Sequence, residues 1–118
     1  MAAVTTIRND FFTDKSHRHT MTLTTADPIS DAIAMIGSAD RSIQSEGTFA
    51  GGSVVTVEGS NDGGVTWAPL NDHFGTAIAQ AAAGLDGIAE IADMIRARLN
   101  PIGAAATINV TIVMRRQT

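Results

Sequence analysis

Residues 107–114 read TINVTIVM, and this stretch decides the fold. Apolar side chains occupy every second position from Ile108 to Met114, while threonine or asparagine fills most of the positions between them. Side chains of a β-strand point alternately to the two faces of its sheet, so the pattern predicts a strand with one buried and one exposed face. The buried face needs a second layer to cover it, which indicates a β-protein with packed sheets.

Residues 17–25 show the same alternation. One side of this segment carries a histidine and two apolar residues, and the other side carries threonines: His19, Met21 and Leu23 against Thr20, Thr22 and Thr24. This period of two predicts a second half-buried strand. The pair Asp27-Pro28 then ends it.

The middle of the chain predicts a β-hairpin. Residues 41–49 and 54–59 are both strand-like, and a Gly-Gly pair at 51–52 favours a turn between them. The two valines at alternate positions of the second run share one face of it. Two packed antiparallel sheets would bury this face in one core with Trp67 and the face that contains Ile108.

Two segments are compatible with either a helix or a strand. Apolar residues in 85–99 recur at spacings of three and four, which fits an amphipathic helix, but residues 94–99 also alternate as a strand would. The isoleucines of residues 29–36 suit a helical turn, and a strand over 32–36 is the alternative. The residues alone leave both alternatives open.

Several short strands separated by turn signals lead to one expectation for the fold. It is an all-β, antiparallel two-sheet β-sandwich, immunoglobulin-like or jelly-roll-like, to which a short helix could be added. The 118 residues suit one domain. Within it, we expect residues 1–40 to form an N-terminal arm and the first strands, with the arm as a candidate docking segment. Residues 41–118 are expected to form the body of the sandwich.

Composition argues against several classes of function. Eight lysine and arginine residues stand against twelve aspartate and glutamate residues, and the net charge of −4 disfavours binding to nucleic-acid phosphates. No apolar run approaches the ~20 residues of a membrane helix, and the N-terminus lacks the features of a secretory signal. We therefore expect a protein that is made in a cytoplasm and has neither a nucleic-acid nor a membrane partner.

The sharpest local pattern is the Asp-box signature S-x-D-x-G-x-T-W, formed by Ser60, Asp62, Gly64, Thr66 and Trp67. A short carboxylate can accept hydrogen bonds from loop amides, glycine takes the strained backbone position, and the aromatic ring packs beneath the loop. The pattern predicts a β-hairpin with a structural role. A calcium site is disfavoured, because one carboxylate falls far short of the roughly six to eight oxygens that calcium takes.

No combination of residues predicts catalysis, so we expect neither an enzyme nor a cofactor. The serines and threonines lack the motif of an activated nucleophile. His17 and His19 fall on one face of their strand and could begin a zinc site, but the spacing offers no third ligand and no cysteine is present. We expect no metal site, and we expect His17, His19 and His73 to face solvent or a partner.

Residues 42–115 resemble a family of tailed-bacteriophage head decoration proteins, also called cement or head-stabilising proteins. The similarity rests on a series of motifs: VTVEGSNDGGVTW at 55–67, GTA at 75–77, GL at 84–85, IRARL at 95–99, PIG at 101–103 and TINVTIVMR at 107–115. The resemblance implies that residues 94–99 form a strand. The alanine- and isoleucine-rich residues 85–93 depart from the family pattern.

The resemblance implies a virion structural protein, made in the host bacterial cytoplasm, that binds the major capsid protein on the capsid exterior and stabilises the shell as a dimer or trimer. Arginine and aromatic side chains often anchor such interfaces. The candidate contacts are Phe11, Phe12, Arg96, Arg98, Arg115 and Arg116. Two alternatives stay open: a glycan-binding module of a virion or tail fibre with Trp67 as its platform, and a tail-tube or tail-completion component.

Overall fold

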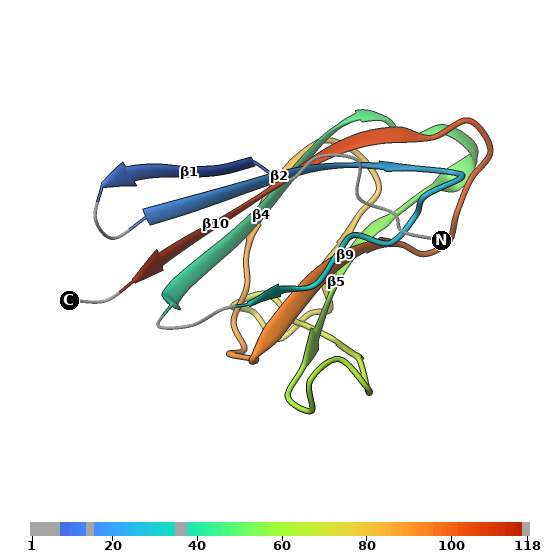
Figure 1. Ribbon diagram of the computed structural model, residues 1–118. Helices are drawn as coiled ribbons and strands as arrows, with labels where there is room; N and C mark the ends of the chain where they lie inside the picture. The colour runs from blue at the N-terminus through green and yellow to red at the C-terminus, as the bar shows by residue number, and fades with distance from the viewer. Residues whose placement is uncertain (1–7, 14–15, 35–37, 117–118) are drawn as a thin grey trace.

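The computed structural model describes residues 8–13, 16–34 and 38–116, which form two antiparallel β-sheets (Figure 1). The first, sheet A, contains five strands in the order β1-β2-β10-β4-β8. Their bounds are Arg8–Thr13 (β1), Ser16–Thr24 (β2), Thr107–Arg116 (β10), Ser38–Thr48 (β4) and Gly84–Gly87 (β8). The strand β10 therefore lies at the centre of sheet A, paired with β2 on one side and β4 on the other.

Sheet B forms the second layer of the molecule (Figure 1). Its strands are β3 (Ile33–Ala34), β9 (Met94–Leu99), β5 (Val55–Ser60), β6 (Ala68–Pro69) and β7 (Ala79–Gln80). They follow the order β3-β9-β5-β6, and β7 pairs with the first residues of β5 on the same edge as β6. The predicted all-β, two-sheet sandwich is confirmed. Helical structure among the described residues is a single 3-10 turn, η1 (Ala50–Gly52).

The core lies between the two sheets and follows the alternation read from residues 107–114. Ile108, Val110 and Ile112 of β10 are fully buried, whereas Thr107 and Asn109 are exposed. Residues of β2, β4 and sheet B complete one apolar cluster: Met21, Leu23, Ile33, Ile43, Val55, Val57, Ile95, Ala97 and Leu99. The strands β2 and β3, which precede residue 41, thus pack in the same core as the later strands.

The hairpin predicted over residues 41–59 is wrong, because β4 and β5 belong to different sheets. The chain crosses between the layers through η1, where Gly51 and Gly52 both have positive φ. A Cβ on Gly51 would lie 2.7 Å from the Ala104 nitrogen, so this crossover packs closely against the loop between β9 and β10. Apolar residues at alternate positions fit two strands of one hairpin and two strands in facing sheets equally well. The sequence pattern is misleading here for this reason.

The helical alternative for residues 85–99 is also wrong. The segment contains the end of β8, at the edge of sheet A, and all of β9, between β3 and β5 in sheet B. Glycines at both ends of β8 disfavour a helix. Ile88, which directly follows β8, and Ile95 of β9 are fully buried, and their spacing imitates a helical stripe because they enter one core from two different layers. Residues 29–36 contain the short strand β3, and residues 35–37 lie outside the described part of the chain.

A buried glutamine ties the two sheets together. Gln80 of β7 is 5% exposed, and its Oε1 accepts a hydrogen bond of 2.6 Å from the Ser45 hydroxyl of β4. Its Nε2 donates to the Ile43 carbonyl (3.3 Å) and to the Asp86 carboxylate (2.8 Å). A buried amide with partners at both ends avoids the cost of an unmet hydrogen bond. Gln80 therefore fixes the position of sheet B against β4 and β8.

We expect Ile108→Ala to lower the free energy of unfolding by about 2–5 kcal/mol, because the substitution leaves a cavity between the sheets. Urea unfolding followed by circular dichroism measures this loss. Thr107→Ala, one residue earlier on the exposed face, is the matched control and should change stability by less than about 1 kcal/mol. Equal losses for the two variants would contradict the assignment of the buried face.

Candidate functional site

The Asp-box residues close the hairpin between β5 and β6. Asp62 Oδ1 accepts hydrogen bonds from the Ser60 hydroxyl (2.7 Å), the Val65 amide (3.1 Å) and the Thr66 amide (2.8 Å). The Ser60 hydroxyl in turn accepts a bond from the Gly64 amide (3.0 Å). The loop thus satisfies its own backbone donors with two side chains, and it holds a fixed shape at the end of β5.

These hydrogen bonds lower the pKa of the Asp62 carboxyl group to about 2. The Thr66 amide contributes most, followed by the Ser60 hydroxyl. Donors that bond to a carboxylate favour its charged form, and this effect prevails here because Asp62 is exposed to water. The described residues contain no group of three or more histidine, aspartate or glutamate side chains that could hold a metal ion. We assign Asp62 to the closure of the loop.

Trp67 braces this hairpin from outside the core. Its indole Nε1 donates a hydrogen bond to the Gly64 carbonyl (2.9 Å), and a Cβ on Gly64 would lie 3.5 Å from the ring. The prediction that Trp67 belongs to the shared core is wrong, since the ring is partly exposed and packs under Arg96. The indole N–H needs a hydrogen-bond acceptor, which an apolar core would not supply, and the loop carbonyl provides one.

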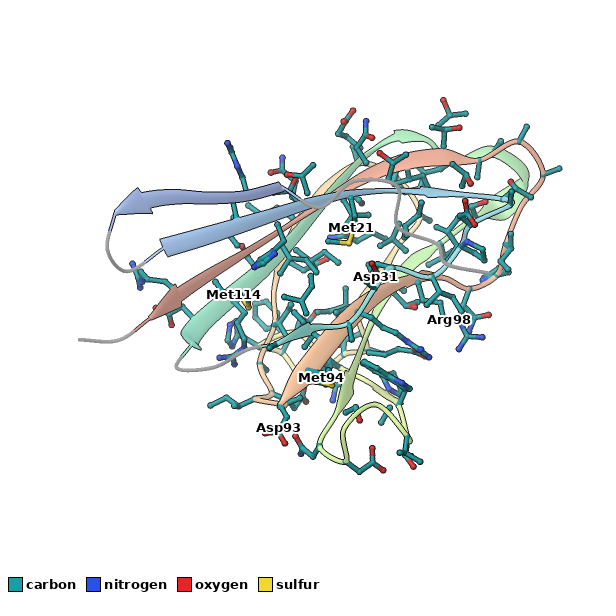
Figure 2. The ribbon with its side chains drawn as sticks, viewed as in Figure 1. Met21, Asp31, Asp93, Met94, Arg98 and Met114 are labelled. Carbon is teal, nitrogen blue, oxygen red and sulfur yellow. The ribbon has the colours of Figure 1, made fainter. Side chains whose placement is uncertain are left out.

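Two arginines, a glutamate and the tryptophan form what we call the arginine–tryptophan cluster: Glu58, Trp67, Arg96 and Arg98. Arg96 and Arg98 alternate with buried residues of β9, so they project from the outer face of sheet B, and Figure 2 shows Arg98 there. Glu58 of β5 is the direct cross-strand neighbour of Arg96. Its carboxylate accepts hydrogen bonds from Arg96 Nε (2.8 Å) and Arg98 Nη1 (3.2 Å).

The cluster presents fixed positive charge. The guanidinium carbon of Arg96 lies 4.2 Å from the centre of the Trp67 ring, within the range of a cation–π interaction. The side chains of Arg96 and Arg98 are 20% and 37% exposed, while that of Glu58 is 12% exposed. One largely buried carboxylate therefore opposes two guanidinium groups, and the cluster carries one net positive charge. Arg98 keeps the larger share of its donors open to a partner.

The structure separates the other candidate contacts from this cluster. Arg115 belongs to sheet A, the opposite layer, where it forms an ion pair with Asp40 in which both side chains are well exposed. Phe11 and Phe12 lie in β1, and Arg116 ends β10. The side chains of these three residues lie outside the part of the chain that the structure describes. Arg96 and Arg98 are therefore the two predicted contacts that the structure brings together.

The expectation that His19 faces solvent or a partner is wrong. His19 shares the inward face of β2 with Met21 and Leu23, and it is 9% exposed. Its position in the alternation of residues 17–25 already placed it on the buried side of the strand. His73 is exposed in the loop between β6 and β7, and the side chain of His17 lies outside the described residues.

Sequence reasoning did not connect Glu58 with the two arginines. The usable signal is the Arg-x-Arg spacing of β9, which places both side chains on one face of a strand. The sequence does not reveal that Glu58 is the cross-strand neighbour of Arg96, because the pairing of β5 with β9 is a long-range contact. The exposed apolar side chains of the loops were also missed, and the most exposed of them is Phe74 at 92%.

No protein-family model, curated protein or solved structure matches this chain. Among the described residues, no helix has the length and apolar character needed to span a membrane.

We expect the Asp62 carboxyl group to titrate with a midpoint of about 2 in carbon-detected NMR. A pKa that is depressed in the folded state stabilises the fold above the unfolded value of 3.8, and this contribution is lost as the pH falls through about 2. Ser60→Ala removes one donor and should move the midpoint upward. A midpoint that is unchanged by Ser60→Ala would contradict the role of the hydroxyl.

Proposed function

We propose that the protein is a virion structural protein that decorates the exterior of an assembled tailed-phage capsid and stabilises it by binding the major capsid protein. The similarity of residues 42–115 to head decoration proteins supports this proposal, and the all-β sandwich is compatible with it. The observation that carries the proposal is the arginine–tryptophan cluster, an ordered cationic patch on the outer face of sheet B.

The cluster has the properties of an anchor for another protein. Tryptophan and arginine are the residues most enriched at the positions that dominate binding energy in protein interfaces. Glu58 and Trp67 hold the Arg96 side chain in place before any partner arrives. Binding therefore costs little side-chain entropy, which normally offsets part of the contact energy of a long arginine.

Charge indicates what the partner surface presents. The cluster is locally positive on a chain whose net charge is −4. A carboxylate on the partner would meet the remaining donors of Arg98 in the geometry that a guanidinium favours. We therefore expect acidic side chains of the major capsid protein opposite the cluster.

Decoration stabilises a shell by mass action. A protein that binds the assembled lattice and has little affinity for free subunits shifts the equilibrium toward the shell. Each contact can be modest, because an oligomer that engages several capsid subunits at once gains avidity. This mechanism requires no catalytic residue.

The geometry around Trp67 supports a glycan-binding role less well than a protein-binding role. Sugar stacking needs an open aromatic face, and Arg96 covers one face of the Trp67 ring. The indole N–H, which could otherwise bond to a sugar hydroxyl, is already donated to the Gly64 carbonyl. Binding of a capsid protein to the arginine–tryptophan cluster would leave both of these Trp67 contacts in place.

We expect the purified protein to saturate a fixed number of sites on phage shells that lack it and to raise the temperature at which those shells come apart. Calorimetry of the shells and quantitative binding by sedimentation measure the two effects. Shells that take up no protein, or whose melting is unchanged at saturation, would rule out this function.

We expect Arg98→Gln to weaken shell binding by about tenfold while the fold persists, because it removes a partly exposed charge and leaves Glu58 paired with Arg96. Glu46→Gln is the control, since Glu46 is exposed on the outer face of sheet A. It should bind shells as the unmodified protein does. The reverse order of effects would place the contact on sheet A.

A further inference from the structure

The methionines differ in their access to solvent. Met21, Met94 and Met114 belong to the part of the chain that the structure describes, and Figure 2 labels all three. Met21 and Met114 lie in sheet A and are 1% and 3% exposed. Met94 begins β9 of sheet B, and it is half-buried on the outer side of an alternation whose inner residues are fully buried. A reagent dissolved in water therefore reaches Met94 before it reaches the other two.

The sulfur of Met94 lies beside the Asp-box loop. A Cβ on Gly64 would lie 3.8 Å from Met94 Sδ and 3.5 Å from Cζ2 of the Trp67 ring, so the sulfur and the ring approach the same point. Gly64 has a φ of 90°, a conformation that favours glycine. The loop consequently has no side chain at this point with which to cover the sulfur.

Strand pairing places Met94 next to the arginine–tryptophan cluster. Met94 is the cross-strand neighbour of Ser60, and Arg96 is the neighbour of Glu58 in the following row. Met94 and Arg96 are two residues apart on one strand, so they share its outer face. Met94 thus adjoins two members of the cluster: Arg96 along β9 and Trp67 across Gly64.

A thioether is open to oxidation by a peroxide. The sulfur donates an electron pair to one peroxide oxygen, the O–O bond breaks, and an S–O bond forms. The sulfur is oxidised to the sulfoxide, while hydrogen peroxide is reduced to water. The product replaces a flexible apolar side chain with a polar one, and methionine sulfoxide reductases reverse the change.

We propose that Met94 is a reversible oxidation site through which a peroxide alters the arginine–tryptophan cluster in the folded protein. The polar sulfoxide fits poorly where an apolar thioether packs beside Gly64 and the Trp67 ring. Its oxygen accepts hydrogen bonds, and the Arg96 guanidinium group is a donor on the same face of β9. An Arg96 side chain that turns toward this oxygen gives up its position over the Trp67 ring, 4.2 Å from the ring centre.

The two core methionines provide an internal reference for this reaction. Their sulfurs meet a dissolved oxidant only when the sandwich opens, and opening of a core costs up to the full free energy of unfolding. Met94 needs no such opening. Its oxidation should therefore proceed while the fold is intact.

A time course with hydrogen peroxide on the folded full chain tests the selectivity. Proteolytic digestion and mass spectrometry measure the sulfoxide at each methionine separately. Met94 should be oxidised at least about tenfold faster than Met21 and Met114. In concentrated guanidinium chloride, where the fold is lost, the three rates should become similar.

Fluorescence tests the effect on the cluster, because Trp67 is the single tryptophan of the chain. Oxidation should shift its emission to longer wavelength, since departure of Arg96 uncovers one face of the ring to water. Methionine sulfoxide reductases acting on both sulfoxide epimers, with a thiol as reductant, should return the emission to its starting position. Circular dichroism before and after oxidation should show the same β-sheet spectrum.

Met94→Leu is the matched control, because leucine is apolar, has a similar volume and resists oxidation. Its emission should stay in place under the same peroxide treatment. Oxidation of Met94 that is no faster than that of Met21 and Met114 in the folded chain would overturn the proposal. So would an emission that does not move, or that moves equally in Met94→Leu. Both measurements use the free chain, so their outcome is separate from that of shell binding.

Discussion

Burial of one face of β10 is the constraint on which the molecule depends. This strand pairs with β2 and β4 on its two sides, so its apolar row supplies the middle of sheet A. Ile108, Val110 and Ile112 are fully buried only because sheet B covers them. Every other feature follows from this layering, since it leaves each sheet with one outer face that is free to carry recognition.

The two outer faces have different chemistry. The outer face of sheet B carries paired charges that are held in place by a glutamate and an aromatic ring. The outer face of sheet A is threonine-rich along β2 and β10, with an ion pair of Asp40 and Arg115 near one end.

The sequence was sufficient where the signal is local. The alternation of residues 107–114 and 17–25 identified two strands of sheet A, and the Asp-box motif identified a loop that folds from its own hydrogen bonds. It was insufficient where the answer depends on distant partners. Pairing between strands far apart in the chain decides three features that the sequence did not reveal. These are the sheets to which β4 and β5 belong, the exclusion of Trp67 from the core, and the carboxylate that pairs with Arg96.

The position of β10 also sets the order in which the structure can be completed. Met21 of β2 pairs with Val110, and Ile43 of β4 pairs with Ile112. Neither β2 nor β4 can therefore form its ladder with β10 until that much later strand has been synthesised. During translation, β2 and β4 emerge with their apolar sides uncovered and their hydrogen-bonding edges open. A topology rich in such distant pairings folds slowly. The nascent chain is therefore most exposed to chaperones, and to association with its own copies, in the interval before residue 107 leaves the ribosome.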